Sequence, residues 1–78
     1  MDEKIRLNDL SINKTAVISS VECNEHLKNR IFDLGIIEGE EITPIFKSPF
    51  GDPTAFLVKK AVIAIRHNDS KHILVIPK

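Results

Sequence analysis

The sequence contains little cysteine and few aromatic residues, and each shortage excludes a class of protein. Cys23 is the only cysteine among 78 residues, so the chain has neither an internal disulfide nor the paired thiols of a zinc finger. Tryptophan and tyrosine are absent, and the 4 phenylalanines form no aromatic row of the kind on which nucleic-acid-binding barrels stack bases. The chain therefore lacks the covalent staples of a small secreted domain and the stacking platform of a nucleic-acid binder.

Net charge and long apolar runs are also missing. The 11 basic and 11 acidic residues cancel, whereas a protein that neutralises many phosphates usually has a basic excess. No stretch approaches the ~18 consecutive apolar residues of a membrane span. Met1–Lys4 leads into no apolar run, so we expect no signal peptide. Together with the lone cysteine, these features predict a cytoplasmic protein.

What is present is the composition of one small globular domain. Apolar residues make up 42% of the chain and charged residues 28%, which is ordinary for a folded protein. A chain of this length buries only roughly 60–65% of the surface that its unfolded form exposes. It cannot enclose a deep catalytic pocket without a partner or a second subunit. We predict a single domain over residues 1–78 that binds another protein and is not an enzyme.

One helix is predicted, over residues 25–34. Asn24 is a favoured N-cap residue, and Gly35 stands where a helix often ends in a left-handed residue. Three apolar residues between them recur at helical spacing: Leu27, Ile31 and Leu34. We expect all three to face the core.

The rest of the chain has strand patterns. Five segments are predicted to be extended: residues 15–21, 42–47, 54–59, 61–66 and 72–76. Ile42, Pro44 and Phe46 are expected on one face, and Pro44 belongs at an edge or a bulge because it has no N–H to donate. The nearly all-apolar segment 61–66 is expected to be a central strand. We predict a mainly β fold, a small SH3-like barrel of about five strands with the helix capping one open end.

Metal and catalytic chemistry have weak support. The candidate ligands are Cys23, His26, His67, Asp69 and His72. Their spacing resembles no zinc site, so we expect surface histidines and a half-buried cysteine, with adventitious metal binding as the alternative. There is no glycine-rich phosphate loop, and a thiolate pair of Cys23 with His26 would need a third orienting group. We predict no metal, no cofactor and no catalytic residue.

The loop over residues 48–53 is the stronger candidate site. Pro49 and Pro53 bracket Phe50-Gly51-Asp52 and restrict the backbone on either side. Two arrangements are open: Phe50 is exposed at a stiff tip, where it would make a good interface anchor, or it folds back as a lid over the barrel.

Phe32 has two interpretations as well. It lies about 100° around the helix from Ile31, at the margin of the buried face. We expect it to extend the core, and the alternative is an exposed patch that a partner covers.

Four segments resemble the FeoA family. Asn29–Gly39 is similar to its Arg-Leu-x-Asp/Glu-Leu-Gly signature and Ser48–Pro53 to its Ser-Pro-Leu-Gly-Asp-Pro loop. Val62–Arg66 resembles its Ile-Ala-Leu-Arg strand, and Ile73–Val75 its closing strand. The order and spacing extend over residues 7–76. One departure is Lys59-Lys60, which stands where family members often carry a glycine.

The resemblance implies an SH3-like fold and a cytoplasmic role beside FeoB, the ferrous iron transporter of the membrane, without an iron site in this chain. Partner contacts are predicted at the loop and the helix: Phe50, Gly51, Asp52, Pro53, Arg30 and Phe32. The alternative is a nucleic-acid-binding barrel with a local basic patch, namely Lys59, Lys60, Arg66 and Lys71. Open strand edges also permit a homodimer.

Overall fold

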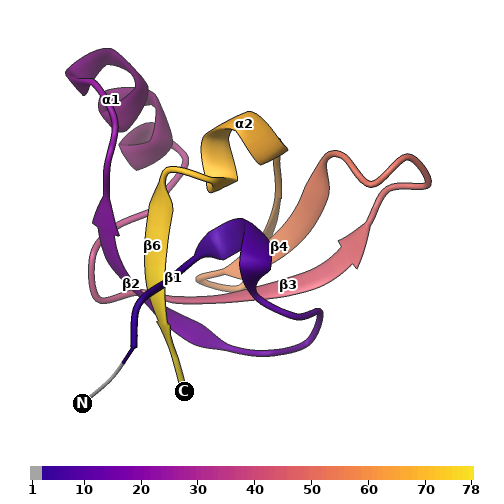
Figure 1. Ribbon diagram of the computed structural model, residues 1–78. Coiled ribbons are helices and arrows are strands. Elements are labelled where there is room, and N and C mark those ends of the chain that lie inside the picture. The colour runs from indigo at the N-terminus through magenta and orange to yellow at the C-terminus, as the bar shows by residue number, and fades with distance from the viewer. Residues whose placement is uncertain (1–2) are drawn as a thin grey trace.

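The computed structural model describes residues 3–78 and has one antiparallel sheet as its framework (Figure 1). The strands are β1 (Ile5–Arg6), β2 (Ala16–Val21), β3 (Glu41–Lys47), β4 (Thr54–Val58), β5 (Ala61–Ile65) and β6 (Ile73–Pro77). The helices are the short 3-10 helix η1 (Leu7–Asp9), α1 (Glu25–Asp33) and α2 (His67–Ser70). The strand order is β1-β6-β2-β3-β4-β5, so the predicted mainly β fold is confirmed.

The sheet curves around the core, and β2 pairs with a different strand on each side. The first residues of β2 pair with β3, at Ala16↔Ile42 and Val17↔Glu41. On its other side, β2 pairs with β6 along most of its length. A register shift between Ile18 and Ser20 adds to the bend, as bulges do. The core lies inside the curve and consists of Leu7, Leu10, Ala16, Ile18, Ile31, Ile36, Ile42, Phe56, Val58, Ile65, Ile73 and Val75. β1 and β5 remain the two edges of a barrel-like sheet.

Helix α1 begins and ends close to the predicted positions. The side chain of Asn24 accepts a hydrogen bond from the Leu27 N–H at 2.8 Å, which is an N-cap contact. Leu34 is the C-cap, and Gly35 follows with φ of +92°, a conformation that favours glycine. In Figure 1 the helix lies at one end of the sheet.

The expected burial of Leu34 is wrong. Ile31 is 1% exposed and Leu27 packs partly against the core, but Leu34 is 39% exposed. The helix ends at Asp33, and the chain turns away before Leu34 can follow the buried stripe. Ile36, beyond the turn, is buried instead. Helix α1 therefore packs on the sheet mainly through the side chain of Ile31.

The expected common face of Ile42, Pro44 and Phe46 is also wrong at its last member. A register shift between Pro44 and Phe46 inserts an extra residue into β3, so Phe46 pairs with Ala55. Because each such insertion moves later side chains to the opposite face, Phe46 is 58% exposed. The prediction that Pro44 lies at an edge or a bulge is confirmed.

Strand β5 is an edge strand, which corrects its expected central position. It pairs only with β4, in register from Thr54↔Ile65 to Val58↔Ala61. Its apolar composition suggested burial on both faces, yet Val62 is 61% exposed. The apolar residues of β5 therefore do not all belong to the core.

The turn between β4 and β5 contains two residues with left-handed backbones. Lys59 has φ of +50° and Lys60 has φ of +67°. Because Val58 pairs with Ala61, these lysines form a two-residue hairpin loop, in which positive φ at both positions is the type I′ signature. Two strained lysines thus make the turn that glycine often makes in the family that the sequence resembles.

No helix within residues 3–78 is long and apolar enough to span a bilayer.

Candidate functional site

Three elements that carry predicted site residues lie along one side of the molecule: α1, α2 and the loop between β3 and β4 (Figure 1). An Arg30 guanidinium nitrogen on α1 lies 2.6 Å from a carboxylate oxygen of Asp69 on α2. The side chain of Asp52 in the loop accepts a hydrogen bond from the His67 N–H at 2.8 Å. Helix α2 therefore connects the two candidate regions. We call the surface formed by Arg30, Phe50, Asp52 and Asp69 the α1–loop face.

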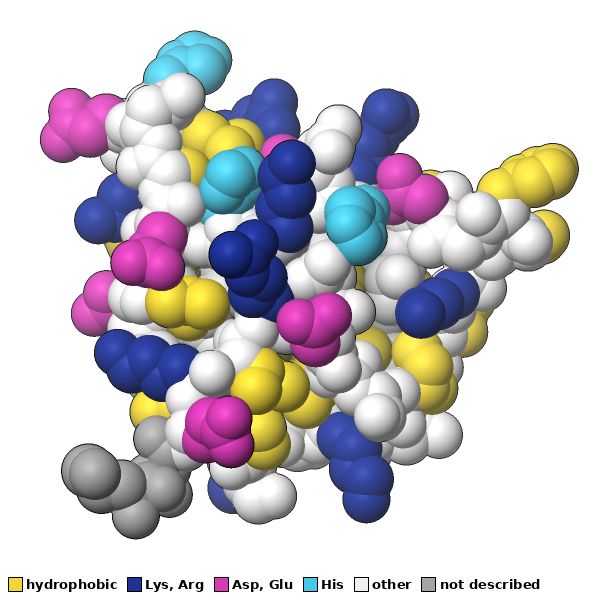
Figure 2. All heavy atoms as spheres, viewed as in Figure 1, with side chains coloured by type: hydrophobic (Ala, Val, Ile, Leu, Met, Phe, Trp, Pro, Cys, Tyr) yellow, Lys and Arg dark blue, Asp and Glu magenta, His cyan; other side chains and the backbone are white. Residues whose placement is uncertain are grey.

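The loop presents Phe50 to solvent. Its side chain is 96% exposed, so the lid arrangement is excluded. The Gly51 N–H donates to the Ser48 carbonyl at 2.8 Å, and the Ser48 N–H donates to the Pro53 carbonyl at 3.1 Å. Gly51 has φ of +84°. Figure 2 shows hydrophobic side chains protruding where Figure 1 draws this loop.

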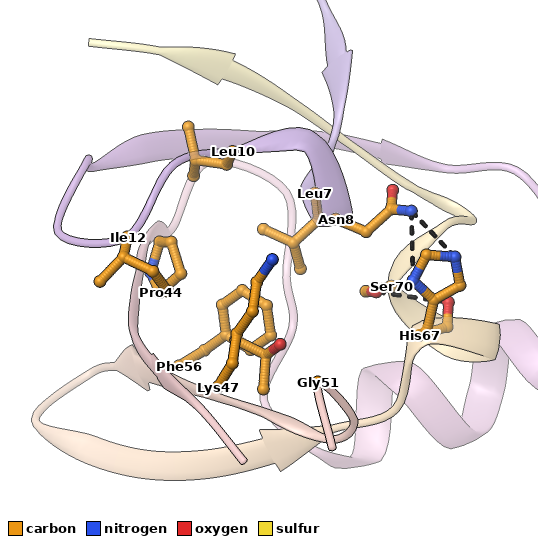
Figure 3. A pocket seen from close by; sticks show the side chains of 11 residues that line it. Leu7, Asn8, Leu10, Ile12, Pro44, Lys47, Gly51, Phe56, His67 and Ser70 are labelled. Atoms are coloured by element: carbon orange, nitrogen blue, oxygen red, sulfur yellow. Dashed lines mark hydrogen bonds between the residues drawn. The ribbon is translucent and has the colours of Figure 1, made fainter. Parts of the chain in front are cut away.

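The space beneath the loop is too small for a ligand. A cavity of about 40 Å³ is lined by side chains that Figure 3 labels, among them Leu7, Asn8, Phe56 and His67. This volume is close to that of a single water molecule. The Asn8 amide nitrogen lies 3.2 Å from Nε2 of His67. Helix η1 therefore contacts α2, whose first residue also donates a hydrogen bond to the Asp52 side chain. The residues around this cavity therefore pack closely beneath the loop.

Phe32 is the second exposed aromatic among the predicted contact residues, on the other side of α1 from Arg30. It is 58% exposed, which corrects the expectation that it extends the core. It lies about 100° around the helix from the buried Ile31, so only part of its side chain is covered. An apolar hollow of about 250 Å³ lies beside it, lined by Val21, Ile36 and Ile37 with Lys28 and Glu38 at the rim.

The candidate metal ligands do not gather into a site. Cys23 is half-buried and unbonded, as predicted, and His26 is exposed. Asp69 is paired with Arg30, and His72 Nδ1 lies 3.1 Å from the Glu22 carbonyl oxygen. Within residues 3–78 no group of three or more histidine, cysteine or acidic side chains could hold an ion.

The predicted basic patch is also dispersed. Lys60 and Arg66 stand at opposite ends of β5, roughly 20 Å apart in an extended strand. Lys59 lies 3.6 Å from a carboxylate oxygen of Glu40. Basic and acidic side chains are interspersed on the face that Figure 2 shows. On that face the described residues form no continuous basic stripe for a phosphate backbone.

A family model describing the FeoA domain matches residues 5–77, which is nearly the whole chain. The chain belongs to the FeoA family. The family is linked to ferrous iron transport, and a fusion protein from Porphyromonas gingivalis joins Fe(2+) transport protein A to the Fe(2+) transporter FeoB. This relative is 30% identical over 71 residues, which are 91% of our chain and 8% of the relative. The chain thus spans only a small part of that protein.

Solved structures of FeoA proteins share the fold. A FeoA-like protein from Clostridium acetobutylicum is 31% identical with a TM-score of 0.88, covering 96% of our chain and 87% of its own. FeoA from Stenotrophomonas maltophilia, described as a prokaryotic SH3 domain protein and solved with zinc, is 29% identical with a TM-score of 0.78. That similarity covers 91% of our chain and 88% of the other. The predicted SH3-like class of this FeoA-family chain is therefore confirmed.

Sequence reasoning identified both exposed aromatics as candidates but missed what connects them. From the sequence, both Asp69 and His67 are only candidate metal ligands. Their contacts with Arg30 and Asp52 join residues 39 and 15 positions apart. No local pattern signals such pairs, because α2 has only four residues and no helical periodicity.

Proposed function

We propose that this chain is an accessory protein of ferrous iron transport that acts by binding the cytoplasmic portion of a FeoB-type transporter, without catalysis. The observation that carries the proposal is the similarity, along 91% of the chain, to a protein in which this module is fused to FeoB. Fusion raises the effective concentration of one domain at the other, which favours domains that act on one another.

The α1–loop face is the proposed contact surface. Phe50 stands almost fully exposed on a loop whose backbone is closed by its own hydrogen bonds and tied to α2 by Asp52. An exposed aromatic on an ordered loop loses little conformational entropy when a partner buries it. Phe32 and the apolar hollow beside it provide a second anchor. Arg30, two residues earlier in α1, points to the other side of the helix, where it pairs with Asp69 next to the loop.

The proposal is tested by titrating the cytosolic domains of the cognate transporter with the chain and two variants. Phe50→Ala and Phe32→Ala should each weaken association by about tenfold or more, the loss typical of an interface anchor. Both variants should keep the thermal midpoint, because neither side chain belongs to the core. Phe46→Ala is the matched control, since Phe46 is a phenylalanine as exposed as Phe32, at 58%, and lies outside the α1–loop face.

Two results together would overturn the proposed function. One is the absence of association between the intact chain and the transporter domains, and the other is normal ferrous iron uptake in a strain that lacks the chain. Association that survives both phenylalanine substitutions would instead move the contact to another surface.

A further inference from the structure

The outer side of β5 has no partner strand. The closing pair Val58↔Ala61 is a hydrogen-bonded pair of a two-residue hairpin. From there, hydrogen-bonded and non-hydrogen-bonded pairs alternate along the two antiparallel strands. The backbone groups of Val62 and Ala64 are therefore directed away from β4, towards the free edge. Between residues 3 and 78 no other segment makes a backbone hydrogen bond to β5.

An exposed apolar strip lies beside this edge. Cross-strand partners share a face of the sheet, so Phe46, Ala55 and Ala64 lie together, as do Leu57 and Val62. Phe46 is on this outer face because of the β3 bulge. The exposed fractions are 58% for Phe46, 40% for Leu57 and 61% for Val62. The free edge of β5 therefore adjoins an outer face with three exposed apolar side chains, on which Ala55 is 6% exposed.

β5 lacks the features that protect strand edges. Native edge strands usually carry a charge, a proline or a bulge, which prevents pairing with other chains. The segment Ala61–Ile65 contains neither proline nor charge, and its pairing with β4 has no register shift. A regular, uncharged edge next to exposed apolar side chains indicates a surface built to receive a strand.

Charge at the two ends of β5 identifies the occupant. Lys59 and Lys60 flank one end and Arg66 the other, and neither Lys60 nor Arg66 makes an ion pair with a residue that the structure describes. Full antiparallel pairing with a second copy would place Lys60 opposite Arg66 of that copy, and like charges so placed are destabilising. Carboxylates at both ends of an incoming strand would instead form ion pairs with Lys60 and Arg66.

We propose that the free edge of β5 binds an extended segment of another protein, apolar in its middle and acidic at both ends, which adds as a further strand. The N–H and C=O groups of Val62 and Ala64 would pair with its backbone. Val62, Leu57 and Phe46 would contact its side chains on the outer face. The site uses β5 and the outer face of the sheet and none of the residues of the α1–loop face, so the inference goes beyond the proposed function.

The probe is a synthetic peptide of about nine residues, with alternating valine and threonine between terminal pairs of glutamate. Titrated into the isotopically labelled chain, it should shift the amide resonances of β5 and slow hydrogen exchange at Val62 and Ala64. A control peptide with lysines in place of the glutamates should bind at least about tenfold more weakly at low salt.

Two sets of variants separate edge binding from general charge effects. Lys60→Glu with Arg66→Glu should weaken peptide binding by at least about tenfold. Lys4→Glu with Lys14→Glu changes the net charge equally on exposed residues away from β5 and should leave the affinity unchanged. Val62→Lys, which adds a charge to the outer face beside the edge, should weaken binding without changing the β4–β5 pairing.

Peptide shifts confined to the hollow beside Phe32, equal losses in the two double variants, or no binding would overturn the inference. A dimer in sedimentation experiments that Val62→Lys dissociates would also overturn it, because the occupant would then be a second copy. Transporter domains that bind all β5 variants normally but not Phe50→Ala would leave the proposed function standing. Peptide binding at the β5 edge without transporter binding would support this inference and contradict the proposed function.

Discussion

Ile31 and Leu34 lie three residues apart in α1 and have different surroundings. Ile31 inserts into the core at 1% exposure, whereas Leu34 is 39% exposed at the C-cap. Helical spacing by itself places both on one face, but the helix ends before Leu34 can follow Ile31 inward. The two positions therefore differ in how much apolar surface folding removes from water.

Ile31→Ala should lower the free energy of unfolding by about 2–5 kcal/mol, the usual cost of truncating a buried aliphatic side chain. Leu34→Ala should lower it by less than about 1 kcal/mol, because much of that side chain already contacts water. Denaturant titration measures both. Equal losses would mean that α1 packs along its whole apolar stripe.

The β4–β5 hairpin shows a local strain that one substitution relieves. Lys60 has φ of +67°, a conformation that costs a residue with a Cβ of order 1 kcal/mol. Lys60→Gly should therefore raise the free energy of unfolding by about 0.5–1 kcal/mol, after allowance for the larger entropy of glycine in the unfolded chain. Ala61→Gly, one residue later in β5, should lower it. A loss with Lys60→Gly would exclude the type I′ turn.

The ion pair between Arg30 and Asp69 holds α1 to α2 more than it stabilises the whole fold. Arg30 is 59% exposed at its side chain, so solvent screens much of the attraction. Asp69→Asn should lower global stability by less than about 1 kcal/mol. Amide exchange within α1 should nevertheless accelerate, because few other contacts hold this helix. Asp33→Asn is the control, and unchanged exchange in α1 after Asp69→Asn would contradict the connecting role of α2.

At the scale of the whole molecule, the sheet divides into a protected centre and an open edge. β2 has neighbours on both sides and contributes Ala16 and Ile18 to the core, whereas β5 pairs with β4 alone. Hydrogen exchange should be slowest in β2 and in its partner β6. Within β5 it should alternate, slow at Ile63 and Ile65 and fast at Val62 and Ala64. Uniform protection along β5 would show that its edge is covered.

Much of the architecture could be predicted from local patterns. The Asn24 cap, the periodicity up to Ile31 and the glycine at position 35 define α1 through contacts within one or two turns. The β-branched segments predict most of the strands for the same reason, since side-chain spacing and backbone preference act over a few residues. The prolines and the glycine predict the loop around Phe50, but they leave open whether Phe50 is exposed or folded back.

Only the tertiary structure decided which apolar residues remain exposed. A single inserted residue in β3 turns Phe46 outward, and the strand order places Val62 at an edge despite its apolar neighbours. The contacts of Asp69 with Arg30 and of Asp52 with His67 join segments far apart in the chain. Strand order, register and long-range pairing depend on the free energy of the whole assembled sheet. Local spacing predicts the elements, and their packing determines the surface available to a partner.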